Sequence, residues 1–202
     1  MSNGFAFWYE NDWTPQRAVE RITSLDAAGL RLAHPSTGRI TALSGDDDTA
    51  GEQIDIDRAT LLERAAVQAD QEFDFQYWID VDVDVVCAIE RLTPDLVVQR
   101  LYLDGLSSEQ QRFVIAVVFD QIRTSPRSTR GLIIDLTGGS GNEDWDALTA
   151  GAPERIAVRA DAMVLPSAAA RQHPELHAGV GVRLGDLITY DPHGLLPTMS
   201  ST

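Results

Sequence analysis

The sequence predicts an α+β fold, a mostly antiparallel mixed sheet with helices packed on one face. Three observations support this. Apolar and polar residues alternate between residues 73 and 91, which is typical of a strand with one buried face. Apolar residues recur at helical spacing behind helix-start signals, near residues 15–28, 58–69 and 108–123. The turn signal Thr93-Pro94-Asp95 separates two strand patterns closely enough for an antiparallel hairpin.

The first third of the chain alternates strand and helix signals. Residues 4–9 predict a strand, and Thr14-Pro15 predicts the start of a helix that Gly29 ends. Two short strands, at residues 30–33 and 39–43, are expected across a turn. Residues 44–57 are acidic without a basic residue, so we expect a solvated loop that leads to a helix capped near Asp57.

The pattern at residues 73–91 is longer than an ordinary strand. We therefore expect one strand with a bend or bulge near Asp80, paired with a strand at residues 96–103. The alternation places Asp80, Asp82 and Asp84 together on its polar face.

The second half opens with the clearest local signal. Ser107-Ser108-Glu109-Gln110 matches a capping box at the start of a largely buried helix. Residues 131–136 are almost all apolar, which predicts a central strand buried on both faces. Weaker patterns predict helical turns at residues 143–150, a loop or short helix at 166–176, and strands at 155–165, 179–184 and 187–190. We expect a single domain over residues 1–196 and a frayed tail over 197–202.

Charge and cysteine content bound the possible partners. The formal net charge is -15, and all 16 basic residues are arginine, which suggests a bacterial coding bias. A field this negative repels nucleic acid and anionic lipid and attracts basic proteins, so we expect neither nucleic-acid nor membrane binding. Cys87 is the single cysteine and forms no internal disulfide. With no secretion signal and no apolar span, this predicts a cytoplasmic protein.

The negative charge is concentrated in residues 44–57 and 70–84. Our leading hypothesis is a non-enzymatic protein that docks a basic protein partner there, in an inhibitor or immunity-type role. The predicted docking face consists of Asp80, Asp82, Asp84, Asp46, Asp47 and Asp48. A plain solvent-exposed sheet face is the simpler alternative. A metal site is another, although carboxylates about 6.6 Å apart along one strand need further ligands from elsewhere.

The sequence resembles two catalytic motifs, but in each a required residue is missing or misplaced. A nucleophile elbow around Ser140 would need glycine where Asn142 stands. His173 and His177 have the spacing of a zinc pair but flank a proline, so we expect surface or loop histidines. We therefore assign no catalytic residue, metal ligand or cofactor and lean against an enzyme. Two alternatives stay open: a carboxylate- or metal-dependent hydrolase, with some of the three strand aspartates and a histidine, and a structural subunit of a larger assembly.

Arg123, Arg127 and Arg130 form the single basic cluster of the sequence. Solvated loop charges are the expected role. In the alternative, they meet the acidic face of a second copy and form a salt-sensitive homo-oligomer.

Overall fold

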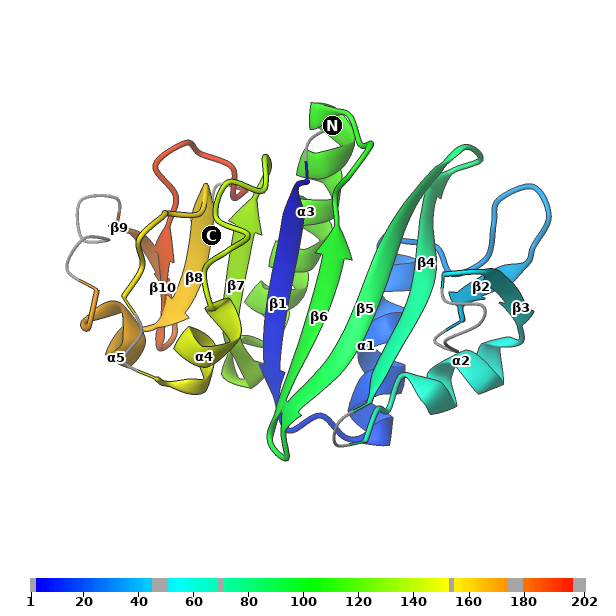
Figure 1. The fold of residues 1–202 in the computed structure, drawn as a ribbon, viewed down its shortest axis with the longest axis horizontal. Coiled ribbons are helices and arrows are strands. Elements are labelled where there is room, and N and C mark those ends of the chain that lie inside the picture. The colour runs from blue at the N-terminus through cyan, green and yellow to red at the C-terminus, as the bar shows by residue number, and fades with distance from the viewer. Residues whose placement is uncertain (1–2, 45–50, 69–70, 153–154, 174–179, 198–202) are drawn as a thin grey trace.

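Ten strands form one antiparallel sheet, in the order β3-β2-β4-β5-β6-β1-β7-β8-β10-β9 (Figure 1). The computed structural model describes residues 3–44, 51–68, 71–152, 155–173 and 180–197. The strands are β1 (Phe5–Asn11), β2 (Ile40–Leu43), β3 (Gln53–Ile56), β4 (Glu72–Asp80), β5 (Val83–Thr93), β6 (Leu96–Tyr102), β7 (Thr129–Asp135), β8 (Ala162–Pro166), β9 (Val180–Leu184) and β10 (Leu187–Tyr190). The predicted α+β class with a mostly antiparallel sheet is confirmed.

The helices are α1 (Pro15–Ala27), α2 (Arg58–Arg64), α3 (Ser108–Thr124), α4 (Trp145–Ala150) and α5 (Ser167–Ala170), with a 3-10 turn, η1 (Pro126–Ser128), after α3. The first three begin where their capping residues predict. Thr14 accepts from the backbone of Arg17, and Asp57 accepts from the backbone of Thr60. Ser107 forms both hydrogen bonds of the predicted capping box. None of the described helices is long and apolar enough to span a membrane.

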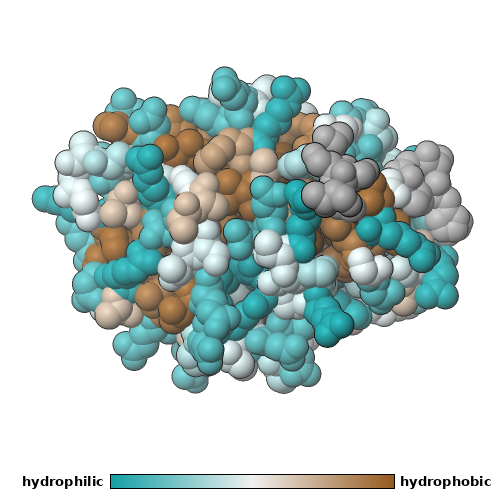
Figure 2. Space-filling model, turned by 180° about the vertical axis from the view of Figure 1, so that it is seen from behind, coloured by the Kyte–Doolittle hydropathy of each residue, from teal (hydrophilic) through white to brown (hydrophobic). Residues whose placement is uncertain are grey.

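The two halves of the sheet are covered differently. The main core, with Trp8, Phe75 and Phe119, lies between the sheet and the first three helices. Figure 2 shows this helical face from outside, with hydrophilic side chains over much of it and separate hydrophobic areas between them. A second, smaller core with Tyr9 and Trp145 lies under α4 on the opposite face of the sheet. β7 is therefore buried on both faces, as the apolar run predicted.

The second core extends over only part of the sheet. Its strand residues come from β1, β6, β7, β8 and β10 and include none from β4. In Figure 1, α4 lies in front of the sheet near β7, and no described helix lies in front of β4 and β5. One face of these two strands and the adjoining part of β6 is therefore uncovered by any described helix.

The prediction of one long strand at residues 73–91 is wrong, because this stretch is a hairpin. β4 ends at Asp80, Val81 and Asp82 form the turn, and β5 begins at Val83. The carboxylate of Asp80 accepts a hydrogen bond of 2.8 Å from the backbone of Val81, which stabilises the reversal. The Asp-Val alternation continues through the turn, so the pattern carries no mark of it. The hairpin between β5 and β6 is confirmed.

Other differences are local. β3 lies within the expected acidic loop, where Ile54 and Ile56 are too few to give a strand pattern. Residues 30–33 form only isolated bridges, from Arg31 to Trp78 and from Ala33 to Ile40. The strand predicted at residues 155–165 is limited to β8, whereas β10 has the predicted bounds.

Candidate functional site

The predicted docking residues do not form a ladder on one strand. Asp80 and Asp82 lie exposed at the turn of the β4–β5 hairpin, whereas Asp84 lies on β5 opposite Trp78. Asp84 is half-buried and accepts a hydrogen bond of 2.8 Å from Nε2 of Gln76. The hairpin thus brings the three aspartates to one end of the sheet. Asp46, Asp47 and Asp48 lie outside the described residues.

The uncovered face is defined by strand register. Phe75, Cys87 and Leu101 are paired across β4, β5 and β6, and all three lie in the helical core. Because side chains alternate along a strand, their neighbours in sequence point to the other face. We call this surface the open face. Its residues are Glu72, Asp74, Gln76, Trp78, Asp84, Val86, Ala88, Glu90, Arg100 and Tyr102.

Negative charge is in excess on the open face. Its residues on β4, β5 and β6 carry four carboxylates and one cation, Arg100, which pairs with Glu90 and with Asp146 of α4. Tyr9 donates a further hydrogen bond of 2.8 Å to Asp146. Burial by itself would lower the pKa of Arg100, but the carboxylates of Asp146 and Glu90 outweigh it and raise that pKa. Arg100 is therefore already paired within the chain. The carboxylates of Glu72 and Asp74 have no ion pair among the described residues.

Two of these carboxylates are held in an unfavourable environment. Burial raises the pKa of Asp74, and the nearby Arg100 only partly offsets it. Burial also raises the pKa of Glu72, and repulsion from Asp74 and Glu90 adds to the increase. A raised pKa means that the folded state disfavours the ionised form, so both groups reduce the stability of the fold at neutral pH.

Three consecutive outward residues of β4 also have unmet hydrogen-bonding capacity. Oδ1 of Asp74, Oε1 of Gln76 and Nε1 of Trp78 are buried and have no hydrogen-bond partner in the described structure. Gln76 is only 4% exposed. Buried polar atoms are nearly always paired, because an unpaired one loses its hydration without replacement. The two oxygens of Asp74 exchange by rotation about χ2, so either can accept from an approaching donor.

Aromatic surface adjoins the carboxylates. Tyr102 is 38% exposed, and its ring meets that of Phe7 edge-on at 6.4 Å between centroids. The guanidinium of Arg100 lies 5.5 Å from the centroid of Phe7. Arginine side chains both pair with carboxylates and stack on aromatic rings. Chemically, the open face is suited to guanidinium and ammonium groups of a partner.

The serine and histidine candidates are placed differently. Ser140 is buried, and its hydroxyl donates to Asp135 at 2.6 Å, so it stabilises the turn after β7. His173 lies in the loop after α5, one of the two expected positions, and is buried there. His177 lies outside the described residues. No group of three or more histidine, cysteine, aspartate or glutamate side chains suited to a metal occurs in the described part of the chain.

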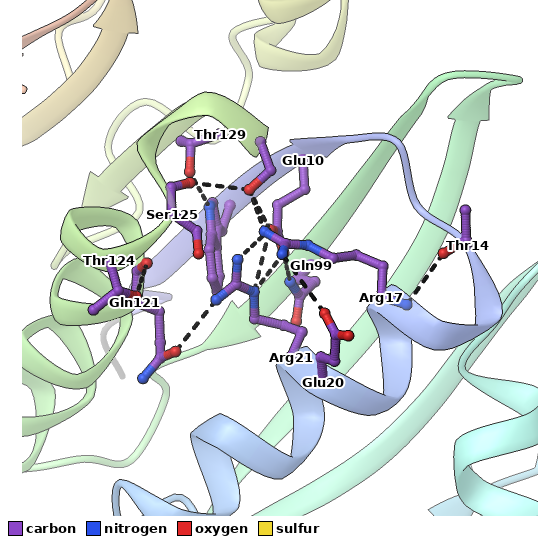
Figure 3. A network of polar contacts seen from close by, with 12 residues as sticks. Glu10, Thr14, Arg17, Glu20, Arg21, Gln99, Gln121, Thr124, Ser125 and Thr129 are labelled. Atoms are coloured by element: carbon purple, nitrogen blue, oxygen red, sulfur yellow. Dashed lines mark hydrogen bonds and ion pairs between the residues drawn. The ribbon is translucent and has the colours of Figure 1, made fainter. Parts of the chain in front are cut away.

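A buried polar network that sequence reasoning missed lies behind β1 (Figure 3). Glu10 is fully buried, and Arg21 contacts both of its oxygens, through Nη2 at 2.6 Å and through Nε at 3.0 Å. Gln99 donates to Glu10 at 2.7 Å, and Arg17 reaches it at 3.3 Å. The one local signal was the spacing of Arg17 and Arg21, which places both on one face of α1.

Comparisons with known proteins leave the family open. No protein-family model and no curated protein matches the sequence. Among solved structures, the Pseudomonas aeruginosa T6SS protein PA0821 is 12% identical, with a TM-score of 0.49 over 93% of this chain and 64% of that chain. The chain therefore spans less than two thirds of that structure. A second structure holds the toxic C-terminal tip of CdiA from Pseudomonas aeruginosa in complex with immune protein; the match is 9% identical, with a TM-score of 0.40 over 69% of this chain and 91% of that chain. At these values neither likeness bears on what this chain binds.

Proposed function

We propose that this chain is a non-enzymatic binding protein whose open face, with the adjoining turn residues Asp80 and Asp82, docks a basic protein partner in an inhibitor or immunity-type role. We propose a cytoplasmic location for it, in line with the single cysteine. The observation that carries the proposal is the row of Asp74, Gln76 and Trp78 on β4, where buried polar atoms are unpaired and burial raises the pKa of the Asp74 carboxyl.

A bound partner would supply the contacts that these groups lack within the chain. Groups that destabilise a fold are characteristic of functional surfaces, because such groups contribute to binding rather than to folding. An arginine or lysine placed against Asp74 would supply the missing donor and lower the pKa of that carboxyl. Charge-assisted hydrogen bonds of this kind typically cost about 2–5 kcal/mol of binding free energy when one partner is truncated.

The net charge of the chain has a separate effect. A charge of -15 attracts any basic protein over a distance of about one Debye length, roughly 8 Å at physiological salt. This attraction is weak and not localised. Specific binding depends on the arrangement of groups on the open face. The experiment must therefore separate specific binding from attraction by net charge.

The test is capture of proteins from a lysate of the source organism at low and at high salt, with two matched variants. The face variant carries Glu72→Gln, Asp74→Asn and Asp84→Asn. The control variant carries Glu20→Gln, Glu63→Gln and Glu109→Gln, which are exposed positions on the three large helices. Each variant removes three negative charges.

We expect a basic protein that the wild type and the control variant retain at low salt and that the face variant loses. Chemical cross-linking of the retained protein should then join it to β4, β5 or the turn between them. Equal losses in the two triple variants would mean that net charge alone attracts the protein, and the proposal would then be wrong.

A further inference from the structure

A pocket of about 380 Å³ lies on the opposite side of the sheet from the open face, where α1 meets the turn after α3. Its lining combines two arginines with three hydroxyl side chains and a proline: Arg17, Thr124, Ser125, Pro126, Arg127 and Ser128. In a chain with a net charge of -15, a pocket lined by cations and hydroxyls without a carboxylate is unexpected.

The buried network next to this pocket leaves part of the hydrogen-bonding capacity of Arg17 unused. Glu10 is shared by two guanidinium groups, and Arg21 contacts both of its oxygens. Arg17 contacts Glu10 only through Nη2, which also donates to the hydroxyl of Ser128. The other carboxylate near Arg17 is that of Glu20, 4.0 Å from Nη1 and beyond hydrogen-bond distance. Two carboxylates therefore face the two arginines, but Nη1 and the buried Nε of Arg17 have no hydrogen-bond partner among the described residues.

Arg127 adds a further positive charge. It is exposed and has no ion pair or side-chain hydrogen bond among the described residues. The neighbouring members of the basic cluster are used differently: Arg123 pairs with Asp120 at 3.1 Å, and Arg130 donates to the backbone oxygen of Thr149 at 3.0 Å. Of the predicted basic cluster, Arg127 is thus the residue left to meet a ligand in the pocket.

One feature opposes an anion here. The pocket lies at the carboxyl end of α3, where the helix dipole places a partial negative charge. That effect is worth only about 0.3–1 kcal/mol at an exposed end, which is less than one charge-assisted hydrogen bond from a guanidinium, about 1.5–3 kcal/mol. Two arginines therefore outweigh it.

We propose that this pocket binds a phosphoryl group, either free phosphate or the phosphate of a small monoester. Arginine guanidinium groups pair with phosphate through two parallel hydrogen bonds, and here the donors are Arg127, Nη1 of Arg17 and the hydroxyl of Ser125. A second pocket of about 470 Å³ shares Pro126 and Arg127 and is also lined by Arg130 and Asp186. It provides room for the remainder of a monoester.

The test compares thermal stabilisation by inorganic phosphate, glycerol phosphate and chloride at equal ionic strength. Phosphate also stabilises proteins in general by exclusion from their surfaces, so matched variants are essential. Arg127→Gln removes the unpaired arginine of the pocket. Arg123→Gln is the control, because it removes an equal charge four residues away and outside the pocket lining. Both residues are exposed, so both variants should fold.

We expect phosphate to raise the melting temperature of the wild type and of Arg123→Gln more than chloride does, and the apparent affinity of Arg127→Gln to fall about tenfold. Backbone amide shifts over residues 124–128 should follow the same titration. Stronger binding of the monoester would identify esters as the ligand, and equal binding would identify the free anion. Identical phosphate responses in wild type and Arg127→Gln, or a response no larger than that to chloride, would overturn the proposal.

Discussion

Replacement of Glu10 by alanine should destabilise the fold more than replacement of any exposed glutamate. The side chain is fully buried and accepts hydrogen bonds from Arg21, Gln99 and Arg17. Removal of one partner of a buried ion pair leaves the other charge uncompensated and costs about 3–5 kcal/mol. Gln99 would also lose the acceptor of its buried amide, so we expect a loss of about 4 kcal/mol. For a chain of this size that lowers the melting temperature by about 8–16 °C.

Urea unfolding at pH 7 measures this loss, and Glu20→Ala is the matched control. Glu20 lies on α1 with its side chain 55% exposed, so its replacement should change the free energy of unfolding by less than about 0.5 kcal/mol. Replacement of Glu10 and Arg21 together by methionine should restore part of the stability, because the fully buried charge of Arg21 is then not left alone and Arg17 keeps its contacts with Ser128 and Glu20. A loss below about 1 kcal/mol in Glu10→Ala would refute the reasoning.

Three further predictions concern single groups. Burial would raise the pKa of Asp135, but hydrogen bonds from Ser140, Thr137 and Gly138 outweigh it and lower that pKa, so its stabilisation is present at neutral pH and is lost as the pH falls through the lowered pKa. Asp135→Asn should therefore cost about 2 kcal/mol at pH 7 in urea unfolding, with a difference that shrinks below about pH 4; a difference independent of pH would contradict this. Asp74 has the opposite effect on stability: because its pKa is raised in the folded state, its ionisation destabilises the fold above the ordinary carboxyl pKa. Asp74→Asn should raise the melting temperature at pH 7 and leave it unchanged below about pH 4, and a lower melting temperature at pH 7 would contradict that sign. Cys87 is fully buried and burial raises the pKa of its thiol, so a thiol reagent should modify it only on unfolding; rapid modification of the native protein would contradict its placement.

The elements that the sequence predicts well are those specified by neighbouring residues. The capping residues Thr14, Asp57 and Ser107 are each satisfied within three residues, and the three helix starts are correct. The β4–β5 hairpin was missed because the Asp-Val repeat has the same period on both sides of Val81-Asp82. No local signal there distinguishes a bulge from a reversal.

The candidate site was predictable only in part. The acidic composition of residues 70–84 indicated a negatively charged strand region, and the open face does contain Glu72, Asp74 and Asp84. The rest depends on distant pairing: Arg100 is brought between Glu90 and Asp146, which is 46 residues away from it in sequence. The buried network also depends on distant pairing, because Gln99 contacts Glu10, which is 89 residues away in sequence. Such contacts follow from strand order, which the sequence pattern does not specify.

The most direct measurement of the central claim is a backbone amide map of the isotope-labelled protein, titrated with an arginine-rich peptide at low salt. If the open face is a docking surface, the largest shifts will fall on β4, β5 and β6 in the wild type, and the Glu72→Gln, Asp74→Asn, Asp84→Asn variant will lose them. Shifts spread evenly over the helical and open faces, or unchanged in that variant, would contradict the claim and show attraction by net charge alone.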